Sequence, residues 1–145
     1  MPTSGARDRF MFVMSIIQFP AALITAILAI GVLTTAGDSP SDIRTVLVVT
    51  GVFGLIVALA QLAAGLVGIS NASKPARVHR LVMFGVFLVA LWVVFTVLYA
   101  ILGQTSDGYV SFGAAELALF LVLLVPQVLY LVAAVRLRQR SNARG

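Results

Sequence analysis

The fold of this chain is decided by residues 46–69, which read VLVVTGVFGLIVALAQLAAGLVGI. This stretch has no charged residue, and it is longer than the roughly 20 residues that a helix needs to cross a bilayer. Three further apolar stretches lie at about residues 10–35, 81–102 and 114–135. The whole chain of 145 residues is 61% hydrophobic, with a mean hydropathy of +1.08. Only 10% of it is charged, whereas a soluble domain has about 25% charged residues.

The sequence therefore predicts an all-α integral membrane protein, a four-helix antiparallel bundle with residues 1–145 in a single transmembrane domain. The first span is long for the core of a cleaved signal peptide, which has about 7–15 residues. It also contains Gln18 and Pro20, which suit a place inside the bundle. We therefore expect the first span to be a retained helix.

Lysine and arginine residues are distributed unevenly between the two sides of the predicted spans. Only Arg44 lies on one side. The other nine lie on the opposite side: Arg7, Arg9, Lys74, Arg77, Arg80, Arg136, Arg138, Arg140 and Arg144. Because segments rich in lysine and arginine stay in the cytoplasm, both termini are predicted to face the cytoplasm, with the chain in the cell inner (cytoplasmic) membrane.

Part of this basic side is predicted to form a surface for a partner protein or for anionic lipid headgroups. Its residues are Lys74, Arg77, Arg80, Arg136, Arg138 and Arg140. Nucleic-acid binding is not expected, because the basic residues are split among three segments without an aromatic platform.

Three glutamines, Gln18, Gln61 and Gln127, lie at matching depths in three spans. Each is nine residues from the polar or charged residue at the predicted cytoplasmic end of its span, namely Arg9, Ser70 and Arg136. That spacing corresponds to roughly 13 Å of helix. Small residues share a face with the glutamines. Since lipid gives no reason to hide leucine, while small and polar residues favour helix contacts, we expect the faces with glutamine, glycine and alanine to point inward.

Two interpretations of the glutamine layer remain open. It is either helix-packing glue, with each amide contributing about 0.6–2 kcal/mol, or a polar pocket for water, an ion or a headgroup. The candidate pocket residues are Gln18, Thr25, Gln61, Trp92, Thr96, Gln127 and Tyr130. We favour packing, because amides do not titrate and pack well as structural pairs.

Arg44 and Glu116 each begin a predicted helix on the side opposite the termini. Glu116 is expected to cap its own helix or to pair with Arg44, because an acidic residue in the first turn complements the helix dipole. Neither an enzyme nor a cofactor or metal site is expected: the chain has no cysteine and one histidine, and no Asp, Glu, Lys, Arg or His lies near the middle of a span.

Residues 60–75, AQLAAGLVGISNASKP, resemble a turn found in small, uncharacterised four-span bacterial membrane proteins. In these proteins a span also ends in Gly-Ile-x-Asn-Ala-x-Lys-Pro before a basic loop. The resemblance extends over about residues 58–90. It implies a bacterial cytoplasmic membrane and brings no activity, substrate or site residue.

The leading functional hypothesis is a membrane protein that acts by helix packing and protein contact, as an accessory subunit, an assembly factor or a homo-oligomer. The alternative is a small transporter, channel or lipid- or amphiphile-binding protein that uses the glutamine pocket. A closed interior at the glutamine depth would favour the first hypothesis, and an open cavity there would favour the second.

Overall fold

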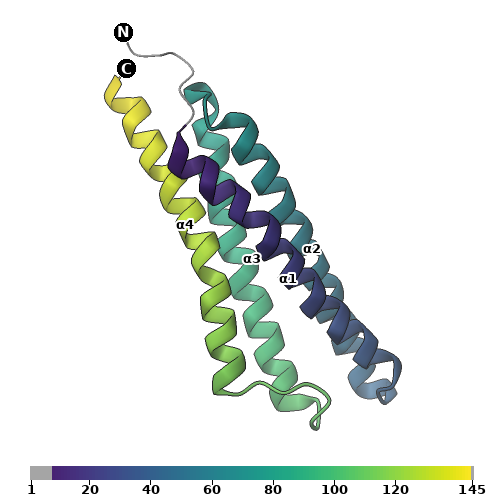
Figure 1. Cartoon of the computed structure of the whole chain (residues 1–145). Helices are drawn as coiled ribbons and strands as arrows, with labels where there is room; N and C mark the ends of the chain where they lie inside the picture. The colour runs from purple at the N-terminus through teal and green to yellow at the C-terminus, as the bar shows by residue number, and fades with distance from the viewer. Residues whose placement is uncertain (1–7, 145) are drawn as a thin grey trace.

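The computed structural model describes residues 8–144, which form four long helices and one short 3₁₀ helix (Figure 1). They are α1 (Arg9–Gly37), α2 (Ser41–Asn71), η1 (Pro75–Arg77), α3 (Val78–Thr105) and α4 (Ala114–Arg144). All four long helices are long and apolar enough to cross a membrane. The predicted all-α, four-helix membrane architecture is confirmed. The helices extend beyond most of the predicted span ends, most of all α4, which continues through its basic tail.

Local sequence signals account for the helix ends. The Asp8 carboxylate accepts a hydrogen bond from the Met11 backbone N–H at 2.8 Å, which caps the first turn of α1. Pro40 stands at the N-cap of α2, and its carbonyl accepts from the Arg44 N–H at 2.9 Å. Between α3 and α4 the chain reverses at Asp107 and Gly108, which both have positive φ, a conformation that glycine adopts at little cost.

The four helices form a closed ring in which each packs on its neighbours in the sequence and α4 packs on α1. We call the end with Asp8, the 72–77 turn and Arg144 the terminal end. The opposite end, with the 38–40 turn and the 106–113 loop, is called the loop end. Helices α1 and α4 lie close together at the terminal end and diverge toward the loop end (Figure 1).

The inward faces predicted from small and polar residues are confirmed for α1 and α2. The buried members on these faces are Met14, Gln18, Ala21, Ala22, Thr25, Ala29, Gly54, Ala58, Gln61, Gly65 and Gly68. A Cβ atom added to Gly54 would lie 2.8 Å from the Ala29 Cβ, and one added to Gly68 would overlap Ser15. Glycine suits these two positions because side chains of α1, and at Gly54 also the Phe95 ring of α3, occupy the space that a Cβ atom would need.

Large apolar side chains cover the outside of the bundle. Leu23, Leu59 and Val122 are each more than 60% exposed, and similar residues surround them on every helix. An apolar surface of this extent is stable only in contact with lipid or other apolar helices. The chain is therefore a small integral membrane protein with four spans.

Candidate functional site

The three glutamines are all buried and lie at about the same level of the bundle, as their spacing predicts. Gln18 and Gln127 have no exposed surface and Gln61 is 1% exposed. The Gln18 Nε2 donates a hydrogen bond to the Pro126 carbonyl oxygen at 3.0 Å, which joins α1 to α4 beside Gln127. The Tyr130 hydroxyl donates to the Ala64 carbonyl oxygen at 2.8 Å, which joins α4 to α2. Gln61 and Gln127 both lie about one helical turn from that second bond, on its loop-end side.

The hydrogen bonds also fix the direction of two of the three amides. The Gln127 Nε2 donates to the Leu123 carbonyl oxygen at 3.0 Å, just as the Gln18 Nε2 donates to the Pro126 oxygen. A backbone carbonyl only accepts hydrogen bonds, so both amide nitrogens must face these carbonyls. The Oε1 atoms of Gln18 and Gln127 then have no hydrogen-bond partner.

Gln61 differs from the other two glutamines because neither end of its buried amide has a partner. The amide nitrogen of Gln61 has two hydrogens to donate. The unpaired Oε1 atoms of Gln18 and Gln127 are two acceptors, so the numbers of free donors and unpaired acceptors are equal. Each buried polar group without a partner costs about 1–3 kcal/mol. The layer is closed, because protein atoms cover these side chains completely, and its polar groups are only partly paired.

The other candidate pocket residues divide between this layer and the next one toward the loop end. Tyr130 adjoins the glutamines. Trp92 donates from its Nε1 to the Phe120 carbonyl oxygen at 3.0 Å, and Phe120 lies about 10 Å along α4 from Gln127. Thr25 and Thr96 donate to carbonyls of their own helices at 2.9 Å. The seven residues therefore lie at two levels of the bundle.

Arg44 and Glu116 were predicted to pair, but among residues 8–144 the structure has no ion pair between their side chains. Arg44 instead donates to the carbonyl oxygens of Ala36 and Ser39, at 3.2 and 2.8 Å. These groups lie at the C-terminal end of α1, where the helix dipole attracts a cation. Glu116 accepts from the Gly113 N–H at 2.8 Å, which is the reciprocal half of a capping box. The capping alternative for Glu116 is therefore the one that the geometry supports.

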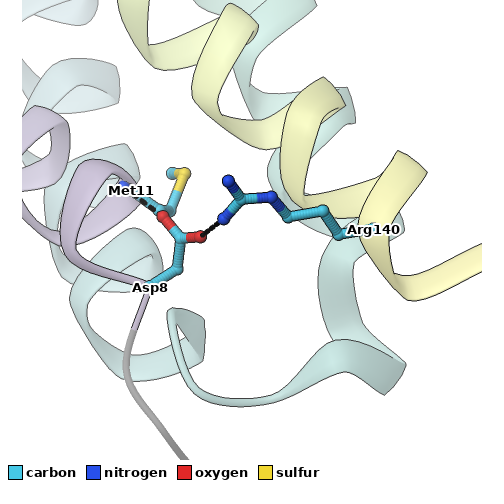
Figure 2. Close-up of polar contacts among 3 residues, drawn as sticks. All are labelled: Asp8, Met11 and Arg140. Carbon is cyan, nitrogen blue, oxygen red and sulfur yellow. Dashed lines mark hydrogen bonds and ion pairs between the residues drawn. The ribbon is translucent and has the colours of Figure 1, made fainter. Parts of the chain in front are cut away.

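Side chains of the predicted basic surface are all exposed at the terminal end: Lys74, Arg77, Arg80, Arg136, Arg138 and Arg140. Two of them also contact α1. The Arg140 guanidinium lies 3.3 Å from the Asp8 carboxylate (Figure 2), and the Arg136 guanidinium lies 5.9 Å from the centre of the Phe10 ring. The other four side chains of the surface make no hydrogen bond or ion pair with residues 8–144.

Asp8 is a junction of three helices that the sequence hypothesis did not include. Besides capping α1 through Met11 and pairing with Arg140 of α4 (Figure 2), its backbone N–H donates to the Ala72 carbonyl oxygen at the end of α2, at 3.0 Å. An aspartate directly before an apolar helical run is a known N-cap signal. That signal identifies the cap, but the contacts with α2 and α4 depend on tertiary structure.

A second site that the sequence did not reveal is a cleft of about 280 Å³ at the loop end. It is lined by residues of α1, by Tyr99 of α3 and by the 106–113 loop. The lining residues are Ile27, Leu28, Gly31, Val32, Thr35, Tyr99, Tyr109, Val110 and Ser111. None of the glutamines belongs to it, so the cleft and the glutamine layer are separate features.

Comparison with protein-family models, with curated proteins and with solved structures finds no match for this chain. The resemblance of residues 60–75 to bacterial four-span proteins stays a prediction. In the structure, this segment is the end of α2 and the turn into α3, where Asn71 donates to the Val67 carbonyl oxygen at 2.8 Å.

Proposed function

We propose that this protein is a non-enzymatic membrane subunit that contacts another protein through its basic terminal end, in the manner of an accessory subunit or assembly factor. The carrying observation is that α4 continues as a helix past its apolar stretch, through the four arginines of its tail, to Arg144. This helix has 31 residues and is therefore about 46 Å long, well beyond the roughly 30 Å of the hydrocarbon core. Its last turns form a basic rod outside the membrane.

The basic rod carries four exposed arginines, Arg136, Arg138, Arg140 and Arg144. Arg136 and Arg140 contact α1, whereas Arg138 and Arg144 have no hydrogen-bond or ion-pair partner among residues 8–144. These two guanidinium groups suit an acidic protein surface, and the same surface would attract anionic headgroups. The closed glutamine layer supports this role, because its cross-helix bonds serve packing.

The arginine distribution supports a terminal end in the cytoplasm, and the resemblance of residues 60–75 supports a bacterial cytoplasmic membrane. The absence of cysteine from the chain allows a direct test with single-cysteine variants in intact cells. Arg138→Cys should react with a thiol reagent only after the membrane is made permeable, and Gln104→Cys should react without that step. The reverse pattern would refute the orientation.

The test of the proposed function is cross-linking in membranes followed by purification in mild detergent and identification of the co-purified proteins. The double variant Arg138→Glu/Arg144→Glu should lose a partner that the unchanged protein retains, because both charges are reversed. A matched control, Gln104→Glu/Thr105→Glu, changes two exposed positions at the loop end and should retain it. Recovery of the unchanged protein alone as a monomer would contradict the proposal.

The unpaired amide atoms favour one second candidate, a polar pathway or pocket at the glutamine layer of a small transporter, channel or lipid-binding protein. That role requires the layer to open to water. Gln61→Cys should then react in membranes with a small, water-soluble methanethiosulfonate. A packed layer predicts no reaction at this position under conditions in which Arg138→Cys is labelled completely.

A further inference from the structure

We propose that the cleft at the loop end binds the alkyl chain of one bilayer lipid between α1 and Tyr99, with an amine-bearing headgroup at the 106–113 loop. This binding site is independent of the proposed protein contact, because the contact surface lies at the opposite end of the bundle. Four properties of the cleft support the inference.

The first property is the position of the cleft. Its α1 wall extends from Ile27 to Thr35, which is about 12 Å along the helix axis. Ile27 is 61% exposed, so this wall opens sideways to whatever surrounds the bundle. The cleft lies at the loop end, between α1, Tyr99 of α3 and the 106–113 loop. The medium that reaches a lateral opening in a membrane helix bundle is lipid.

The second property is the order of polar and apolar residues along the cleft. The part nearer the middle of the membrane is apolar, with Ile27 and Leu28. The part at the end of α1 has hydroxyl groups, from Thr35, Tyr109 and Ser111. An amphiphile in a membrane has the same order, with its chain toward the middle and its headgroup at the interface. The volume of about 280 Å³ is close to the small end of the range of ligand pockets, about 300–1,000 Å³, which suits a single chain.

The third property is Gly31 in the wall of the cleft. A Cβ atom added at this position would meet no other atom within 4 Å, whereas one added to Gly54 or Gly68 would collide with α1. Close helix packing therefore explains Gly54 and Gly68 but not Gly31. Glycine is less favourable than alanine within a helix. At Gly31 the wall of the cleft borders open space, which a lipid chain can occupy.

The fourth property is the charge of the loop end. Asp38, Asp42, Asp107 and Glu116 lie there. The single basic side chain at this end, Arg44, is engaged by the carbonyl oxygens of Ala36 and Ser39. Ser111, which lines the cleft, donates to the Glu116 carboxylate at 3.2 Å, so a carboxylate lies beside the cleft. This charge favours an amine-bearing headgroup over a purely anionic one.

The test is native mass spectrometry of the full chain after exchange into detergent with phosphatidylethanolamine or phosphatidylglycerol. The unchanged protein should retain one phosphatidylethanolamine about fivefold better than phosphatidylglycerol, the preference that one charge pair of about 1 kcal/mol provides. Gly31→Leu fills the open space at this position and should lower this retention about tenfold. The control Ala90→Leu, which enlarges an exposed residue of α3 outside the cleft, should change retention less than twofold.

The variant Glu116→Gln keeps the shape of the side chain and removes its charge. It should bring the retention of the two lipids to within about twofold of each other, and it decides the proposal if Gly31→Leu does not fold. Circular dichroism checks the helix content of every variant. Equal retention of both lipids by the unchanged protein would overturn the proposal, since lipids around the whole bundle would explain it. Unchanged retention by folded Gly31→Leu would overturn it as well.

Discussion

Helix α1 packs along two seams that are held in different ways. Toward α2, close contacts continue along the helix: Gly68 meets Ser15 near the terminal end, and Gly54 meets Ala29 nearer the loop end. Toward α4, the side-chain interactions lie in the terminal half: Gln18 donates to the Pro126 carbonyl oxygen, and Asp8 and Phe10 meet arginines of α4. Beyond that bond the two helices diverge (Figure 1). Small residues spread along a face hold two membrane helices over their length, whereas single polar bonds hold them at points.

Gly68→Val should have the largest effect on this difference between the seams. The added side chain overlaps Ser15, so α1 and α2 must separate, which costs about 1–3 kcal/mol or more in a packed interior. Thermal unfolding in mild detergent, followed by circular dichroism, measures the loss. Gly31→Ala is the matched control, since its Cβ meets nothing and the substitution removes the cost of glycine. We expect this control to raise the unfolding temperature; similar losses in both variants would refute the contrast between the seams.

An intermediate effect is expected at the polar bond of the second seam. Gln18→Leu removes the donor to the Pro126 carbonyl oxygen and should cost about 0.6–2 kcal/mol. Gln61→Leu removes an amide that has no partner and should leave the free energy of unfolding unchanged or raise it. Denaturant titration of both variants in one detergent gives the comparison. A larger loss for Gln61→Leu than for Gln18→Leu would indicate that Gln61 does bond within the layer.

The smallest effect is expected at the outermost contact of the α1–α4 seam. Asp8→Asn keeps a side chain that can cap α1 but removes the charge that pairs with Arg140. The Arg140 side chain is 55% exposed, and exposed ion pairs contribute about 0.2–1 kcal/mol. Unfolding measured at low and at high salt should show a small loss that salt reduces. Arg138→Gln, at a position without a partner, serves as the control and should show no such salt-dependent loss.

The features that follow from composition and helical spacing were predictable from the sequence. Long uncharged stretches such as residues 46–69 permit little except a spanning helix. The inward direction of Gln18, Gln61 and Gln127 followed because a bilayer offers an amide no partner. These predictions rest on properties of one helix at a time, and the structure confirms them.

The features that depend on the geometry between helices were not predictable. Arg44 and Glu116 share one end of the bundle, but each has a nearer partner at a helix end, which spacing along the sequence does not reveal. The cleft depends on how α1, Tyr99 of α3 and the 106–113 loop come together, and no residue pattern specifies that arrangement. The contact of Asp8 with Arg140 likewise joins residues from opposite ends of the chain. These two residues come together only when all four helices have packed.

The two seams of α1 also differ in when they can form during synthesis. The partners of the α1–α4 contacts are 108 residues apart for Gln18 and Pro126, and 132 residues apart for Asp8 and Arg140. The hairpin of α1 and α2 is complete as soon as Asn71 has left the ribosome. Until α4 follows, one side of α1, including the Gln18 amide, faces the insertion machinery or lipid, at the cost of an unpaired polar group. Closing the ring is therefore the last step in building this bundle.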